Sequence, residues 1–214
     1  MVSFFKAHNT KYLLLFSVFG ITLVLIRQYI KPDMRFLFLI KNLLLAWVPF
    51  IISACLSKKR LKFYVLYPLL FLWLLFFPNA LYLITDYFHL WPKPSTSVWY
   101  DLIMISTFAI VGLFLALSSL KKIESLMLRK RSKSLAKLII VVFMYLGSLG
   151  VYIGRFMRLN SWDVIKDPVY FKQEGLFFFE NPFDDVDLYI APVVFTLFLC
   201  FFYYGIFNFA KNQQ

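Results

Sequence analysis

The sequence predicts an all-α integral membrane protein, a polytopic bundle of about six transmembrane helices with both termini in the cytoplasm. Of the 214 residues, 61% are hydrophobic and the mean hydropathy is +0.73, whereas a soluble domain is about half apolar. The apolar residues form six continuous runs of about the 20 residues that a helix needs to cross a bilayer. Of the 23 lysines and arginines, 14 lie on one side of the predicted membrane, at the two termini and in two connections, whereas 8 lie on the other side.

The runs are continuous rather than alternating apolar with polar residues, which favours helices over the strands of a membrane barrel. Lys41 and Asn42 interrupt the second run. Pro78 lies inside the third and predicts a kink, because proline lacks the amide hydrogen that a helix needs. Gly150 and Gly154 in the fifth would permit close contact with a neighbouring helix. The chain is expected to form one membrane domain over residues 1–214. Its predicted helices cover residues 12–30, 35–56, 63–88, 99–120, 138–156 and 188–209.

Basic residues indicate the orientation of the bundle. The connection at 57–62 carries four lysines and arginines, and the connection at 121–137 carries seven. Basic loops stay in the cytoplasm, so the long connection at 160–187 is expected outside. It holds seven acidic residues and two aromatic stretches. Two interpretations of it stay open: a cap lying on the membrane surface, or an unstructured acidic loop.

Composition also argues against several classes of function. The net charge is +12, but the basic residues lie in short loops, so we expect contact with anionic lipid head groups rather than with nucleic acid. Cys55 and Cys200 both lie inside apolar runs, which predicts neither a disulfide framework nor a zinc site. His8 and His89 are the only histidines, and no nucleotide-binding or metalloprotease motif occurs. We therefore expect no bound metal and no cofactor.

With this topology, the unusual polar residues fall near one depth, below the outer surface. Asn79, Tyr82, Asp86 and His89 are spaced by three, four and three residues, which places them on one helical face. Arg155 ends a similar face on the fifth helix. The sequence thus predicts an outward-facing polar pocket. Its predicted lining is Asn42, Asn79, Asp86, His89, Asp101, Arg155, Arg158, Asn160 and Asp163.

Two interpretations of this pocket remain open. Charged groups inside a bilayer are costly, so they usually pair or serve a function. In the first interpretation, Asp86 and Asp101 pair with Lys41, Arg155 or Arg158 and merely lock the bundle. In the second, the arginines bind an anion, since a guanidinium matches phosphate.

In that functional interpretation, three residues are candidates for proton transfer: Asp86, His89 and Asp101. The candidate substrate-binding residues are Asn42, Asn79, Arg155, Arg158, Asn160 and Asp163.

Four strings of residues carry a resemblance to a known family. They cover residues 42–49, 77–90, 99–102 and 154–163, and include Phe77-Pro78-Asn79-Ala80 and Gly154-Arg155-Phe156. In combination they resemble a bacterial multi-pass membrane family known as domain of unknown function 1361. The resemblance implies a place in the bacterial plasma membrane and implies no activity.

The leading hypothesis is binding or processing of an anionic, phosphate-bearing envelope lipid or glycolipid. Membrane lipids are then the expected partners, while protein partners are not predicted and the question of enzymatic activity stays open. The alternatives are a transporter or export component, and a non-catalytic scaffold for envelope assembly. A transporter needs a polar path through both leaflets, whereas the halves of the helices opposite the pocket look nearly all apolar.

Overall fold

The computed structural model describes residues 7–32, 34–58, 61–90, 98–129, 131–155, 169 and 186–209. Within these residues the fold is all-helical, and six helices are long and apolar enough to cross a membrane. The prediction of a polytopic helical bundle is therefore confirmed. The helices are α1 (Ala7–Ile30), α2 (Leu37–Lys58), α3 (Phe63–Thr85), α4 (Val98–Leu128), α5 (Lys133–Arg155) and α8 (Asp187–Phe209).

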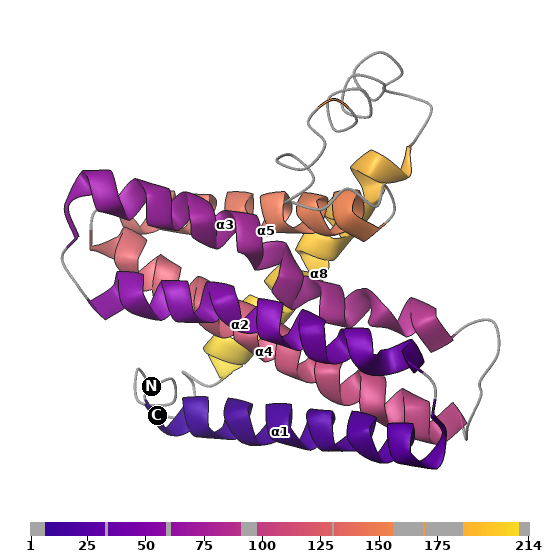
Figure 1. Cartoon of the computed structure of the whole chain (residues 1–214). Coiled ribbons are helices and arrows are strands. Elements are labelled where there is room, and N and C mark those ends of the chain that lie inside the picture. The colour runs from indigo at the N-terminus through magenta and orange to yellow at the C-terminus, as the bar shows by residue number, and fades with distance from the viewer. Residues whose placement is uncertain are drawn as a thin grey trace.

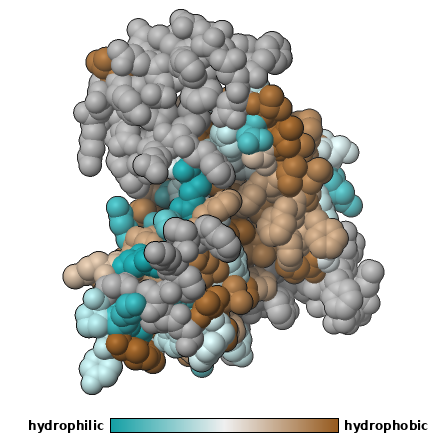
Figure 2. Space-filling view, turned by 90° about the vertical axis from the view of Figure 1, so that its right-hand side faces the viewer, coloured by the Kyte–Doolittle hydropathy of each residue, from teal (hydrophilic) through white to brown (hydrophobic). Residues whose placement is uncertain are grey.

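Successive helices run in opposite directions, so that α1 begins and α8 ends on the same side of the bundle (Figure 1). We call this side the proximal end. The distal end is the opposite one, where α1, α3 and α5 end and α2, α4 and α8 begin. Two short 3₁₀ helices lie there, η1 (Met34–Phe36) before α2 and η2 (Asp86–Leu90) after α3. Figure 2 looks onto the distal end and shows hydrophilic residues among apolar ones, beside a hydrophobic surface.

Helices α2, α3 and α4 pack against one another, α1 packs on α4, and α5 packs on α3 and α8. Trp73 of α3 lies fully buried against Phe77 and Phe143, and its indole N–H donates to Ser119 Oγ at 2.6 Å. Large apolar side chains also cover the outside, with Phe71 67% and Phe201 75% exposed. Such a surface suits hydrocarbon, where no polar exterior is required.

Several helices extend further than the apolar runs predict. Helix α4 continues from the expected end at residue 120 to Leu128, and α5 begins at Lys133 rather than at residue 138. Lysine and glutamate are good helix formers, so the helical backbone continues beyond the hydrophobic stretch. Figure 1 shows α3 bending along its course, as expected for a helix with Pro68 and Pro78 inside it.

Candidate functional site

The distal end of α3 carries a buried carboxylate. The α-helix ends at Thr85, and the chain continues from Asp86 as the 3₁₀ helix η2. A 3₁₀ helix has three residues per turn, so residues three apart lie on the same face. Asp86 and His89 are therefore aligned, and the side chain of Asp86 has no exposed surface.

Arg155, the last residue of α5, joins the two helices. Its Nη2 donates to Asp86 Oδ1 at 2.6 Å and to the carbonyl oxygen of Thr85 at 2.7 Å. Its Nη1 lies 3.1 Å from His89 Nε2. From α2, the side-chain amide of Asn42 donates to Asp86 Oδ2 at 3.3 Å. Asn42, Asp86, His89 and Arg155 therefore form one group, which we call the Arg155 cluster.

A glycine face on α5 makes this meeting possible. A Cβ atom at Gly150 would lie 2.5 Å from Pro78 Cγ, and one at Gly154 would overlap the phenol of Tyr82. Without these side chains the two helices approach closely enough for Tyr82 Oη to donate to the carbonyl oxygen of Gly150 at 3.0 Å. The predicted close helix contact therefore occurs between α3 and α5, and it brings Arg155 to the end of α3.

The hydrogen bonds of the Arg155 cluster leave donors in excess. Both carboxylate oxygens of Asp86 already accept a bond. A guanidinium has five N–H donors, and Arg155 uses three of them on the described residues. Its Nε is buried with no acceptor among those residues. The side chain of Arg155 is 19% exposed, so an additional ligand of this cluster should be an acceptor of hydrogen bonds, such as an anion.

His89 occupies the rim of the cluster, with its ring centroid 4.5 Å from that of Phe38. Arginine can only donate, so the contact with Arg155 requires His89 Nε2 to be the unprotonated nitrogen. The ring proton then belongs to Nδ1. In this arrangement the basic nitrogen of His89 is already occupied and is not free to take a proton from a ligand.

Asp101 belongs to a second ion pair. Its Oδ1 accepts a hydrogen bond from Arg27 Nε at 2.7 Å, and both side chains are 2% exposed. The Arg27 guanidinium lies 4.2 Å from the ring centroid of Phe36. Sequence analysis offered Lys41, Arg155 and Arg158 as partners of the aspartates and did not identify Arg27. The carboxylate of Asp101 is therefore paired with α1 rather than with Arg155.

The remaining predicted residues divide into two groups. Asn79 is buried, and its amide donates to the carbonyl oxygen of Phe76, one turn earlier in its own helix, at 3.1 Å. Arg158, Asn160 and Asp163 lie outside the described residues. Within the part of the chain that the structure describes, no three histidine, cysteine, aspartate or glutamate side chains gather as metal ligands would.

The fold and the site define a multi-pass α-helical membrane protein with a polar cluster at one end of the bundle. The chain belongs to the family described as "Protein of unknown function (DUF1361)", which matches residues 41–202. The match includes all four residues of the Arg155 cluster but not α1, which supplies Arg27. No curated protein and no solved structure matches the chain.

Proposed function

We propose that this protein binds an anionic, phosphate-bearing lipid or glycolipid at the outer face of the bacterial plasma membrane, with Arg155 as the anion-binding residue. The orientation follows from the basic residues of the connections at the proximal end, which the positive-inside rule assigns to the cytoplasm. The Arg155 cluster then faces outward, at the depth of lipid head groups. Charged groups at this depth are costly and commonly serve binding.

The excess of donors on Arg155 is the observation that carries the proposal. Asp86 and the carbonyl oxygen of Thr85 hold the guanidinium in place, but they do not saturate it. A phosphate oxygen could accept a hydrogen bond from the second proton of Nη1, whose other proton points to His89. A guanidinium bonded to an anion gains about 1.5–3 kcal/mol per hydrogen bond. A cationic ligand would find no comparable site, because each oxygen of Asp86 already has a donor.

The geometry favours binding over catalysis. Proton transfer by His89 would first require Arg155 to release His89 Nε2. Asp101, the third candidate acid, is buried against Arg27 and offers no exposed carboxylate. A catalytic role for Asp86 and His89 would therefore depend on a rearrangement that follows ligand binding.

A transporter is less well supported. In the proximal halves, which we expected to be nearly all apolar, Ser119 and Glu124 of α4 are buried. Glu124 is helical because α4 continues to Leu128, which turns this carboxylate inward. Ser119 accepts from Trp73 and Glu124 accepts from Tyr203. These bonds between helices favour a structural role over a polar path.

The test is lipid binding by the purified full-length chain in detergent. Native mass spectrometry would compare dioleoyl phosphatidic acid with dioleoyl phosphatidylcholine. We expect the wild type to retain the anionic lipid, and Arg155→Gln to weaken that retention about tenfold or more, the equivalent of losing one charged hydrogen bond. The matched control is Arg35→Gln, which removes the same charge from an exposed position at the same end.

The double variant Asp86→Asn with Arg155→Gln removes both charges together and guards against misfolding caused by an unpaired Asp86. Circular dichroism and gel filtration would establish that each variant is folded. Equal retention of phosphatidic acid by the Arg35 and Arg155 variants would disprove the proposal, since general attraction to the basic surface would then explain the binding.

A further inference from the structure

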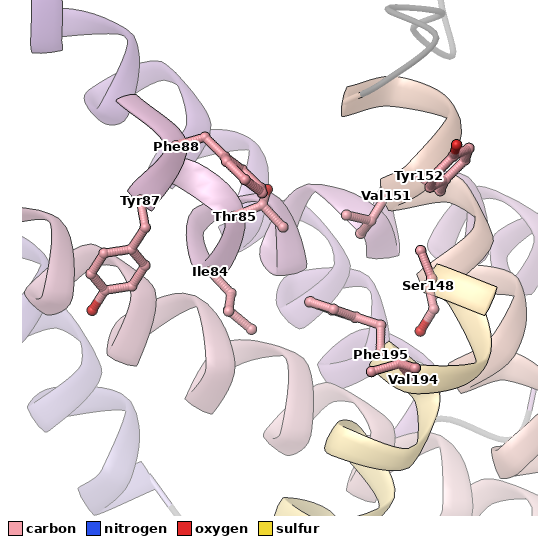
Figure 3. Close-up of a pocket in the computed structure, with 10 residues that line it drawn as sticks. Ile84, Thr85, Tyr87, Phe88, Ser148, Val151, Tyr152, Val194 and Phe195 are labelled. Carbon is pink, nitrogen blue, oxygen red and sulfur yellow. The ribbon is translucent and has the colours of Figure 1, made fainter. Parts of the chain in front are cut away.

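A cavity of about 600 Å³ opens beside the Arg155 cluster. Its walls come from the end of α3 and η2, from α5 and from the first turns of α8, as Figure 3 shows. All of these segments lie within the helices that are apolar enough to span the membrane. Its volume falls within the range of about 300–1,000 Å³ that is common for ligand sites. The lining residues are Ile84, Thr85, Tyr87, Phe88, Ser148, Val151, Tyr152, Ala191, Val194 and Phe195.

The chemistry of the walls suits hydrocarbon. Apart from two small hydroxyl residues, aliphatic and aromatic side chains make up the lining. The two hydroxyls are already bonded within the protein, because Thr85 donates to the carbonyl oxygen of Tyr82 and Ser148 to that of Met144. The phenol of Tyr87 donates to Ser106 Oγ on α4. These three groups therefore leave little demand for a polar ligand inside the cavity.

Helix α8 contacts α4 near its proximal end and packs against α5. Near the proximal end, Tyr203 of α8 donates to Glu124 Oε2 at 2.9 Å, and the Lys121 ammonium of α4 lies 4.9 Å from the ring centroid of Phe207. Figure 1 shows α8 crossing the bundle obliquely from these contacts toward the distal end. There its residues face the cavity, with Phe195 and Val194 drawn opposite Thr85 and Val151 in Figure 3.

The cavity adjoins the Arg155 cluster through residues next to it in the chain. Thr85 lines the cavity, and its carbonyl oxygen accepts a hydrogen bond from Arg155 Nη2. Tyr152 lines it three residues before Arg155, on the same helical face. Phe88 lines it immediately before His89. A molecule with its charged group at Arg155 therefore has an apolar space directly beside that group, at membrane depth.

We infer that this cavity holds a hydrocarbon chain of the anionic lipid whose head group Arg155 binds. The inference rests on the proposed function and narrows its ligand to a long-chain lipid, because a water-soluble phosphate or glycan would leave the apolar walls empty. Shape and length of the chain would then contribute to selectivity, while the guanidinium selects the charge. Each buried methylene group favours binding by the hydrophobic effect.

Chain length and a cavity-filling substitution test this inference. The probes are dioleoyl phosphatidic acid and dihexanoyl phosphatidic acid, which share a head group. We expect the full-length protein to bind the long-chain lipid at least about tenfold more tightly than the short one. Val194→Trp should fill the cavity and reduce this preference to near unity. Val193→Trp is the matched control, because Val193 is the neighbouring residue, is 48% exposed and does not line the cavity.

The outcomes separate this inference from the proposed function. If Arg155→Gln weakens binding of both lipids and Val194→Trp removes only the chain-length preference, both ideas are supported. If Arg155→Gln weakens binding but the Val193 and Val194 variants behave alike, the cavity is not the chain site and the proposed function survives. If the wild type also retains dioleoyl phosphatidylcholine, and Val194→Trp reduces the retention of both lipids equally, the cavity takes any lipid chain. The assignment to an anionic lipid is then overturned.

Discussion

Two ion pairs lie at the distal end, and they differ in how completely the protein encloses them. Arg27 and Asp101 connect α1 to α4, with both side chains 2% exposed and the guanidinium against Phe36. Arg155 and Asp86 connect α5 to η2, with the aspartate fully buried and the arginine 19% exposed. The first pair is closed by aromatic packing, whereas the second is partly open and adjoins a cavity.

The comparison shows that a charge inside the bilayer does not by itself identify a functional site. Both pairs satisfy the same electrostatic requirement, since each carboxylate neutralises one guanidinium. The open pair retains hydrogen-bond donors and has space beside it for a ligand. We therefore interpret the closed pair as a structural connection and the open pair as a binding site, and the two roles should respond differently to substitution.

The largest expected effect is on the closed pair. Asp101→Ala should leave the Arg27 charge buried without its partner, which costs about 3–5 kcal/mol for buried ion pairs. Thermal unfolding in detergent, followed by circular dichroism, would measure the loss. The matched control is Asp187→Ala at the exposed start of α8, where we expect a small change.

The double variant Arg27→Met with Asp101→Leu should recover most of the lost stability, because apolar residues can replace a buried pair. It should also bind phosphatidic acid as the wild type does. A double variant that folds but loses lipid binding would contradict a purely structural role for this pair.

A smaller effect is expected where α3 and α5 meet. Gly150→Leu would force the side chain into Pro78, and such overpacking costs about 1–3 kcal/mol. Because the change moves Arg155 away from Thr85, lipid retention should fall by more than stability alone explains. Gly205→Leu is the control, since a Cβ there meets no atom within 4 Å.

Retention unchanged in folded Gly150→Leu would show that the open pair does not depend on the glycine face. Impaired retention in Gly205→Leu would show that any bulky residue on a helix disturbs binding. Either outcome would remove the structural reason for distinguishing the α3–α5 contact from the rest of the bundle.

Sequence patterns predicted the helices well because a bilayer imposes length and polarity on each span. They also identified Asp86, His89 and Arg155, since ionisable residues are rare at that depth. The partner of Asp101 was not predictable, because the order of helices along the chain does not determine which of them become neighbours. The local bond of Asn79 was not predictable from helical spacing, because its amide donates to the carbonyl oxygen of Phe76 in its own helix rather than to a residue of the Arg155 cluster.

The cavity left no signal in the sequence that could have been recognised. Ala191, Val194 and Phe195 have the same apolar character as the lipid-facing residues of α8. What separates them is the oblique course of α8, which depends on contacts near its other end, such as Tyr203 with Glu124. Packing between distant segments therefore determines this feature.

The smallest expected effect concerns two tyrosines that make equivalent bonds beside the two pairs. Tyr100 donates to the carbonyl oxygen of Leu23 at 2.8 Å near the closed pair. Tyr82 donates to the carbonyl oxygen of Gly150 at 3.0 Å near the open pair. Replacing either with phenylalanine should cost about 0.5–1.5 kcal/mol of stability, the net value of one hydrogen bond.

Lipid binding should separate the two variants even though their stabilities are similar. Tyr82→Phe loosens the contact that positions Arg155, so retention of phosphatidic acid should decrease a few-fold, the equivalent of about 1 kcal/mol. Tyr100→Phe should leave retention unchanged, because the bond between α1 and α4 does not reach the Arg155 cluster. Equal losses of binding in both variants would mean that the whole distal end, rather than the open pair alone, determines the affinity for the lipid.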